Sequence, residues 1–169
     1  MIKELNIALI GCGNWGKNIA RDLHQMGFLA CIYDSNFKLS EKLSYDYTLP
    51  TLKLHEIFED QNINAIVIAS PAITHKDLAI EALENNKDVF IEKPFCLSLP
   101  DAQKLSQLAK NKKRVLMVGH LLNYHNAFIK MKILVKNGKI GIPQNIRANR
   151  LALGAIRSEE SVIYDLSAH

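Results

Sequence analysis

Three glycines within one short segment, Gly11-Cys12-Gly13-Asn14-Trp15-Gly16, match the pattern G-x-G-x-x-G. The segment follows a compact apolar run over residues 5–10 and opens a stretch with helical periodicity, the context that gives this pattern its meaning. There the first glycine makes a tight turn, the second lets a diphosphate approach the backbone, and the third lets the helix pack on the strand. The N–H groups at the start of the helix favour phosphate. The segment therefore predicts a dinucleotide-binding loop, with Trp15 either covering the dinucleotide or only packing beside it.

Two neighbouring features decide between this interpretation and a rival one. The segment also fits the phosphate-binding pattern G-x-x-x-x-G-K, but Asn18 stands where that pattern needs a Ser or Thr to hold magnesium. Asp34 ends the second apolar run, near the ~20-residue spacing expected of a carboxylate that binds ribose hydroxyls. The same carboxylate repels a 2′-phosphate, so NAD is favoured over NADP. The alternative interpretation is that these glycines and Asp34 only form turns and bind no cofactor.

Glu92-Lys93-Pro94 is the second segment that can carry chemistry, because it follows an apolar run over residues 88–91. Ligands of open α/β sheets bind outside the carboxyl ends of the strands, so this segment is expected at the nicotinamide end of a dinucleotide. A lysine there can polarise or protonate a substrate hydroxyl. Pro94 can fix the turn, with a cis peptide bond as one option.

Ser70-Pro71 and His75 follow the preceding apolar run, residues 65–69, in the same way. They are predicted to lie beside the cofactor loop. For His75, a position in the first turn of a helix without any ligand is the competing interpretation.

Short apolar runs alternate with helical stripes along the first two thirds of the chain, which is typical of parallel strands joined by crossover helices. The pattern predicts an α/β fold, a Rossmann doubly wound parallel sheet. Capping-box spacing predicts helix starts at Thr74 (with Asp77) and Ser98 (with Asp101). The expected strands cover residues 5–10, 28–33, 65–69, 88–91 and 115–118, with a weaker one at 47–49; the first two helices cover residues 14–26 and 37–45.

The pattern changes after Gly119. A helical stripe carries Phe128, Met131 and Val135, and residues 142–153 alternate as a half-exposed antiparallel strand does. We therefore expect a dinucleotide-binding domain over residues 1–120 and the beginning of a second α/β domain over residues 121–169.

Composition excludes several classes of protein. The 169 residues are 48% hydrophobic and 22% charged with a net charge of +4, as in a folded soluble domain. The basic residues are spread along the chain, so nucleic acid is not an expected partner. No apolar stretch is long enough to span a membrane, and no signal region precedes the first strand. The three cysteines lack metal-ligand spacing, which predicts reduced thiols, no metal site and a cytoplasmic location.

Taken together, these motifs resemble the Gfo/Idh/MocA family of NAD(P)-dependent oxidoreductases. The resemblance covers essentially the whole chain and rests on the glycine loop, Asp34, residues 69–75, Glu92-Lys93-Pro94 and Gly119-His120. It implies a two-domain protein of about twice this length, with NAD held by the first domain and the substrate site, with much of any homo-oligomer contact, in the second.

The later segments resemble members that oxidise the 3-hydroxyl of UDP-N-acetylhexosamines or their uronic acids. The resemblance rests on residues 119–125 and 149–160. It implies that His169 is the general base on the substrate hydroxyl, with Asp165 and Lys93 beside it. Histidine suits that step because its pKa is near neutral.

The sequence thus predicts hydride transfer between NAD and a hydroxyl of a sugar or nucleotide sugar. A truncated, non-catalytic dinucleotide-binding protein is the alternative.

Overall fold

Five parallel strands form one sheet in the order β2-β1-β3-β4-β5. The computed structural model describes residues 5–147 and 149, and the chain divides into two compact units, Met1–Gly119 and His120–His169. The sheet belongs to the first unit. Its strands are β1 (Ile7–Ile10), β2 (Leu29–Tyr33), β3 (Ala65–Ile68), β4 (Asp88–Ile91) and β5 (Leu116–Val118).

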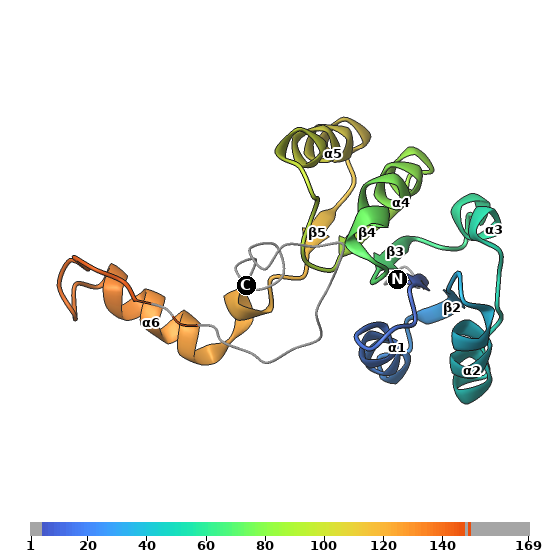
Figure 1. The fold of residues 1–169 in the computed structure, drawn as a ribbon, viewed down its shortest axis with the longest axis horizontal. Helices are drawn as coiled ribbons and strands as arrows, with labels where there is room; N and C mark the ends of the chain where they lie inside the picture. Colours follow the sequence, from blue (N-terminus) through green and yellow to red (C-terminus); the bar gives the residue numbers. More distant parts are fainter. Residues whose placement is uncertain (1–4, 148, 150–169) are drawn as a thin grey trace. The chain divides into compact units, whose positions relative to one another are not determined.

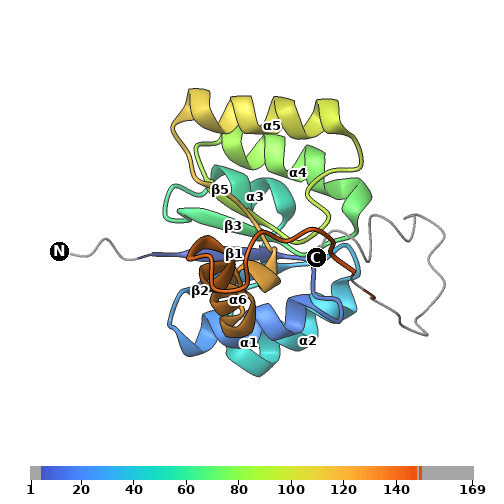
Figure 2. The same ribbon diagram turned by 90° about the vertical axis from the view of Figure 1, so that its left-hand side faces the viewer.

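Helices cover both faces of the sheet (Figures 1 and 2). One face carries α1 (Gly16–Gln25) and α2 (Phe37–Tyr47); the other carries α3 (Leu54–Glu59), α4 (Ala72–Glu84) and α5 (Leu99–Lys112). The chain leaves β1 for β2 on one side and later returns to β3 on the other. The strand order therefore reverses between β1 and β3, and ligands of such sheets bind beyond the carboxyl ends of the strands at that point. The predicted doubly wound parallel sheet is confirmed.

Alternate residues of the interior strand β1 enter two separate cores. Ala8 and Ile10 pack with α3, α4 and α5, whereas Ile7 and Leu9 pack with α1 and β2. All four side chains are buried, which explains why the strand is a continuous apolar run without alternation. The two cores hold the strand ends, and so the loops that follow them, in fixed positions.

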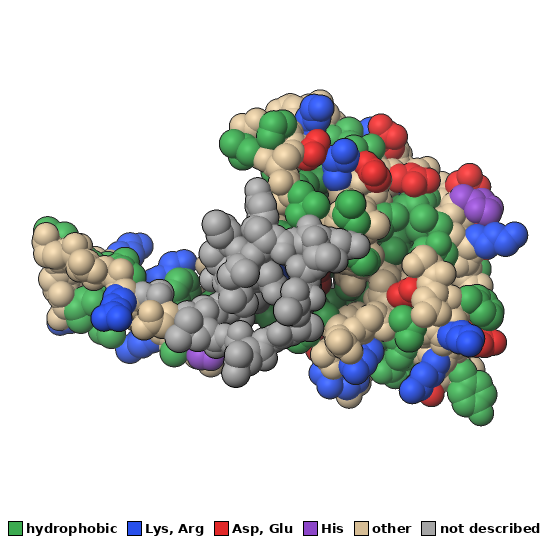
Figure 3. Space-filling view, in the orientation of Figure 1, with side chains coloured by type: hydrophobic (Ala, Val, Ile, Leu, Met, Phe, Trp, Pro, Cys, Tyr) green, Lys and Arg blue, Asp and Glu red, His purple; other side chains and the backbone are tan. Residues whose placement is uncertain are grey.

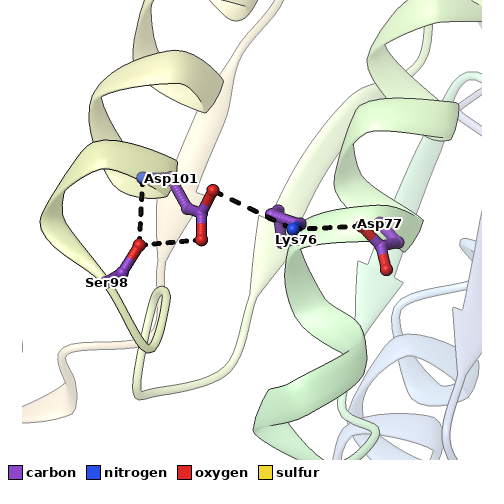
Figure 4. Close-up of polar contacts among 4 residues, drawn as sticks. All are labelled: Lys76, Asp77, Ser98 and Asp101. Atoms are coloured by element: carbon purple, nitrogen blue, oxygen red, sulfur yellow. Dashed lines mark hydrogen bonds and ion pairs between the residues drawn. The ribbon is translucent and has the colours of Figure 1, made fainter.

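Two predicted helix starts have different outcomes. Ser98 is the N-cap of α5, where its Oγ accepts the Asp101 N–H over 3.3 Å and donates to Asp101 Oδ2 over 2.7 Å. Figure 4 shows Asp101 facing Lys76 on α4, whose Nζ lies 3.9 Å away. The predicted start at Thr74 is wrong, because α4 begins at Ala72 and Thr74 Oγ1 donates to Pro71 O over 2.7 Å.

The predicted short strand at residues 47–49 is also wrong. Helix α2 continues to Tyr47, and Thr48 then adopts a left-handed φ of 55° while the Leu49 N–H donates to Ser44 O over 2.9 Å. This is a Schellman-type helix end. Extended pairing occurs only slightly later, as an isolated bridge between Thr51 and Ile32.

Helix α3 was absent from the sequence prediction. It has 6 residues, too few for a helical period to emerge. The Lys53 N–H at its start donates to Glu56 Oε2 over 2.7 Å, and Ile57 and Phe58 are almost fully buried in the core. Tertiary packing, which the sequence pattern does not display, therefore stabilises this helix.

The second unit contains a short 3₁₀ helix, Leu121–Tyr124, and helix α6, Asn126–Lys136. Helix α6 confirms the predicted helical stripe. The expected strand over residues 142–153 is not formed in residues 142–147; its remainder, apart from Asn149, lies outside the described residues.

The Ser98 cap gives a direct test of the α5 boundary. We expect Ser98→Ala to lower the free energy of unfolding by about 1 kcal/mol, because it leaves the Asp101 N–H without its acceptor. Ser106→Ala is the matched control: this exposed hydroxyl, also on α5, donates only to Ala102 O, and its loss should change stability by less than about 0.5 kcal/mol. Urea denaturation of both variants decides, and equal stability losses would contradict the cap.

Candidate cofactor-binding site

The glycine loop between β1 and α1 is shaped by close backbone contacts. Gly11 has a φ of 102°, and a Cβ there would lie 2.5 Å from both the carbonyl carbon of Ala69 and the nitrogen of Ser70. A Cβ on Gly16 would overlap the carbonyl oxygen of Gly11. Both positions therefore require glycine, one to let the loop touch the end of β3 and the other to let α1 start against the loop.

Gly13 is different, because its environment is open. No atom lies within 4 Å of a Cβ built at Gly13. In the described part of the chain, the backbone N–H groups of residues 13–16 meet no protein acceptor. Helix α1 has no acidic residue in its first turn and no side-chain cap at its start. The loop therefore offers unpaired donors and the positive end of a helix dipole to an anion, an arrangement that fits a diphosphate.

The Asn18 side chain is directed back toward the glycine loop. Its Nδ2 donates to the Asn14 carbonyl over 3.3 Å. The side chain thus supports the loop from within α1, which agrees with the dinucleotide interpretation over the P-loop one.

Asp34 lies next to the glycine loop, directly after β2. Its Oδ2 accepts the Cys12 N–H over 2.6 Å and its Oδ1 accepts the Asn36 N–H over 2.8 Å. Each carboxylate oxygen has a further lone pair, so two hydroxyls can still be accepted. Asp34 therefore fixes the loop and keeps the acceptors that ribose hydroxyls need.

The loop thiol of Cys12 is buried, which disfavours its reactive thiolate form. Burial, with a smaller contribution from the negative charge of Asp34, raises the pKa of Cys12 to about 12. Burial likewise raises the pKa of Cys31 to about 12 and that of Cys96 to about 11. All three cysteines are free, and no group of metal-binding side chains occurs among the described residues.

His75 joins the loops that follow β3 and β4. Its Nδ1 lies 2.8 Å from Pro94 O and its Nε2 lies 2.9 Å from Ser70 O, and the side chain is 1% exposed. Carbonyl oxygens only accept, so a neutral ring donates to one of them and a protonated ring to both. The ring is enclosed by protein and holds together the loops after β3 and β4. A contact of His75 with the cofactor itself stays a prediction.

The two loops themselves lie at the carboxyl edge of the sheet. Ser70 is half-buried and Pro71 is exposed. The peptide bond between Lys93 and Pro94 is cis.

Glu92 contacts the glycine loop across the sheet edge. The Trp15 indole N–H donates to Glu92 Oε1 over 2.7 Å, and the Lys93 N–H donates to Glu92 Oε2 over 3.2 Å. The sequence motifs located both segments without showing that they touch. The sequence could have indicated that the two segments are neighbours, because the carboxyl ends of parallel strands meet at one edge of the sheet. It could not indicate which side chains pair, because that depends on the conformation of the loops.

Asp165 and His169 lie outside the described residues. The expectation that they join Lys93 therefore stays a prediction. Lys93 itself is half-buried in the loop after β4.

Surface charge is mixed. Figure 3 shows Lys and Arg side chains alternating with Asp and Glu on the face of the first unit that it draws. None of the helices in the described residues is long and apolar enough to cross a membrane.

Residues 5–120 match the model of the Gfo/Idh/MocA oxidoreductases, described as an oxidoreductase family with an NAD-binding Rossmann fold. The chain belongs to the Gfo/Idh/MocA family. The match contains the glycine loop, Asp34 and the loops after β3 and β4, so the resemblance inferred from the motifs is confirmed.

Two curated relatives of this Gfo/Idh/MocA chain illustrate the family. The Thermotoga maritima myo-inositol 2-dehydrogenase is 30% identical, with 98% of this chain and 52% of the relative aligned. The Escherichia coli 2,7-anhydro-N-acetylneuraminate hydratase is 28% identical, over 81% of this chain and 37% of the relative. This chain thus spans about half the length of such relatives, or less.

A solved structure of similar fold contains the cofactor. GenD2 from gentamicin A biosynthesis, in complex with NAD, has a TM-score of 0.77 and 25% identity, over 82% of this chain and 41% of that one.

The contrast between Gly13 and Gly16 yields a matched pair of variants. Gly13→Ala should leave the free energy of unfolding within about 0.5 kcal/mol, because the methyl group enters open space, yet weaken NADH binding by occupying the diphosphate position. Gly16→Ala should cost more than about 1 kcal/mol, because its Cβ overlaps the Gly11 carbonyl.

Chemical denaturation and calorimetric NADH titration measure both effects. Unchanged NADH affinity in Gly13→Ala would contradict the assignment of this loop to the diphosphate.

Proposed function

We propose that this chain provides the NAD-binding part of a dehydrogenase that oxidises a ring hydroxyl of a polyol, sugar or nucleotide sugar. The observation that carries the proposal is the loop of residues 11–16, with its unpaired N–H groups beside the Asp34 carboxylate. Family membership supports the chemistry, and the relative named as an inositol dehydrogenase supports a cyclic polyhydroxylated substrate.

Each part of the site has a separate task in this proposal. Backbone N–H groups of residues 13–16 bind the diphosphate, and Asp34 accepts the hydroxyls of the adenosine ribose. The nicotinamide, when bound, supplies the hydride acceptor. Lys93 orients the substrate hydroxyl and stabilises the oxygen as its proton leaves, and His169 with Asp165 accepts that proton.

The remaining assignments are proposals of the same kind. Ser70 and Pro71 contribute to the wall of the nicotinamide end, and residues 121–169 begin the part that binds substrate. The cysteine content favours a cytoplasmic location. Homo-oligomer formation is part of the same proposal, because the family resemblance places much of the oligomer contact in the second domain.

Turnover distinguishes the proposed enzyme from a non-catalytic binding protein. NAD reduction is followed at 340 nm with myo-inositol and with UDP-N-acetylglucosamine, which separates a free ring from a nucleotide sugar. NADH binding without NADH formation from any polyol would favour the binding protein. Binding of neither NADH nor NADPH would contradict both. Because one relative is named as a hydratase, the products are also analysed for net addition or loss of water.

Lys93 is the residue whose substitution should separate chemistry from cofactor binding. We expect Lys93→Met to lower kcat by about 100-fold or more, the scale of a lost acid–base group, while the NADH dissociation constant changes by less than about threefold. Lys104→Met, at an exposed position of α5, is the matched control and should leave both unchanged. Equal losses of turnover and NADH affinity in Lys93→Met would contradict the assigned role.

Asp34 should set the preference for NAD. Asp34→Ser removes the charge that repels a 2′-phosphate, so the ratio of NADPH to NADH dissociation constants should fall by about tenfold or more. Asp22→Asn removes a charge from an exposed aspartate on α1 and should leave the ratio unchanged. Calorimetric titration of both cofactors decides, and an NADPH preference in the original chain would contradict NAD as the cofactor.

A further inference from the structure

Glu92 lies where three segments at the carboxyl edge of the sheet meet. It directly follows β4, and its side chain reaches the glycine loop that follows β1 and the glycine that follows β5. The side chain is only 8% exposed. Burial of a carboxylate is unfavourable in free energy unless its oxygens accept hydrogen bonds.

The two oxygens of this carboxylate serve different segments. Oε1 accepts the indole N–H of Trp15, in the glycine loop, over 2.7 Å. Oε2 accepts the backbone N–H of Lys93 over 3.2 Å. One side chain therefore holds both the loop that would bind the diphosphate and the backbone of the residue proposed to act on the substrate.

Gly119 provides the space for this carboxylate. A Cβ at Gly119 would lie 2.9 Å from Glu92 Oε1 and 3.1 Å from both Glu92 Cδ and the Phe90 ring. The end of β5 thus forms a wall against which the Glu92 side chain packs. A side chain at residue 119 would therefore crowd the carboxylate oxygen that meets Trp15.

Trp15 is not held in place by burial alone, because 45% of the residue is exposed. Trp15 is also the N-cap residue of α1 and makes no side-chain capping bond there. Among the described residues, the hydrogen bond to Glu92 Oε1 is the polar contact that holds the indole.

We propose that Glu92 is a positioning residue that couples the glycine loop to Lys93 through Trp15. The proposal rests on the proposed function, because it gives the two coupled segments their roles in cofactor binding and catalysis. A carboxylate suits this task because it has two acceptor oxygens and no donor, whereas a glutamine has one acceptor oxygen and an amide that donates.

This difference between the two side chains predicts a specific failure in Glu92→Gln. A glutamine oxygen accepts either the Trp15 N–H or the Lys93 N–H, and its amide group then faces the other donor. One of the two contacts is lost. In the double variant Trp15→Phe/Glu92→Gln the indole donor is absent, so the glutamine oxygen is free to accept the Lys93 N–H again. The second substitution should therefore repair part of the damage caused by the first.

The contact is tested in the cofactor-free 169-residue chain by amide hydrogen exchange and by tryptophan emission. Trp15 is the only tryptophan of the chain, so the emission reports the environment of this residue alone. Glu92→Gln should either speed exchange of the Lys93 amide by about tenfold or shift Trp15 emission to longer wavelength. In the double variant, exchange of the Lys93 amide should return to within about threefold of its rate in Trp15→Phe.

Hydrogen exchange at two other backbone amides serves as a control for a general loss of stability. The Glu92 N–H donates to Ile68 O over 2.9 Å and the Gly119 N–H donates to Ile91 O over 2.8 Å, so both report the end of the sheet. Their exchange rates should stay within about threefold of the original. If Glu92→Gln changes neither Lys93 exchange nor Trp15 emission, or changes all three amides equally, the coupling is contradicted.

Calorimetric NADH titration then tests the functional consequence. Glu92→Gln and Trp15→Phe should each weaken NADH binding by about tenfold. The glycine loop lacks its hydrogen bond to residue 92 in these variants, so NADH binding must pay the entropy of ordering it. The double variant should bind NADH no more weakly than the single variant that has the lower affinity. If the two losses of affinity multiply, the substitutions act independently and the coupling is contradicted. Glu81→Gln, at an exposed position of α4, should leave affinity unchanged.

Failure of the original chain to bind NADH would contradict the proposed function, whereas the exchange and emission results judge the Glu92 contact separately.

Discussion

The close approach of Gly11 to the backbone of Ala69 and Ser70 is the constraint on which the rest of the site depends. At 2.5 Å from a hypothetical Cβ, this contact admits no side chain. It brings the loop after β1 against the loop after β3, at the point where the strand order of the sheet reverses. The first residue of α1, Gly16, packs in turn on the carbonyl oxygen of Gly11.

Two carboxylates hold the glycine loop from opposite sides. Asp34, after β2, accepts the Cys12 N–H, and Glu92, after β4, accepts the Trp15 indole N–H. These carboxylates accept the Cys12 backbone N–H and the Trp15 side-chain N–H. Neither takes up the backbone N–H groups of residues 13–16, which stay available to a ligand. His75 holds the loops after β3 and β4 together, because its ring lies between the carbonyl oxygens of Ser70 and Pro94. The site is thus ordered by protein contacts before any ligand arrives, which lowers the ordering cost of binding.

Much of the fold followed from local patterns, and the errors have physical causes. Interior strands such as β1 were predictable because strands buried on both faces are continuous apolar runs. Helix α3 was not, because 6 residues are too few for a helical period and its stability comes from burying Ile57 and Phe58. The strand expected at residues 47–49 failed because a Schellman-type end at Thr48 extends α2 in its place.

The sequence by itself determined which segments form the site. Glycine spacing, Asp34 at the end of a strand and the Glu92-Lys93-Pro94 turn each depend on chemistry local to a few residues. Only the tertiary structure decided which of these side chains face a ligand and which support another residue. His75 and Glu92 belong to segments that the sequence places beside the cofactor, and the structure buries both side chains against protein groups of other loops. The reason is that a hydrogen bond spanning 77 residues, such as that between Trp15 and Glu92, depends on how two loops converge at the sheet edge.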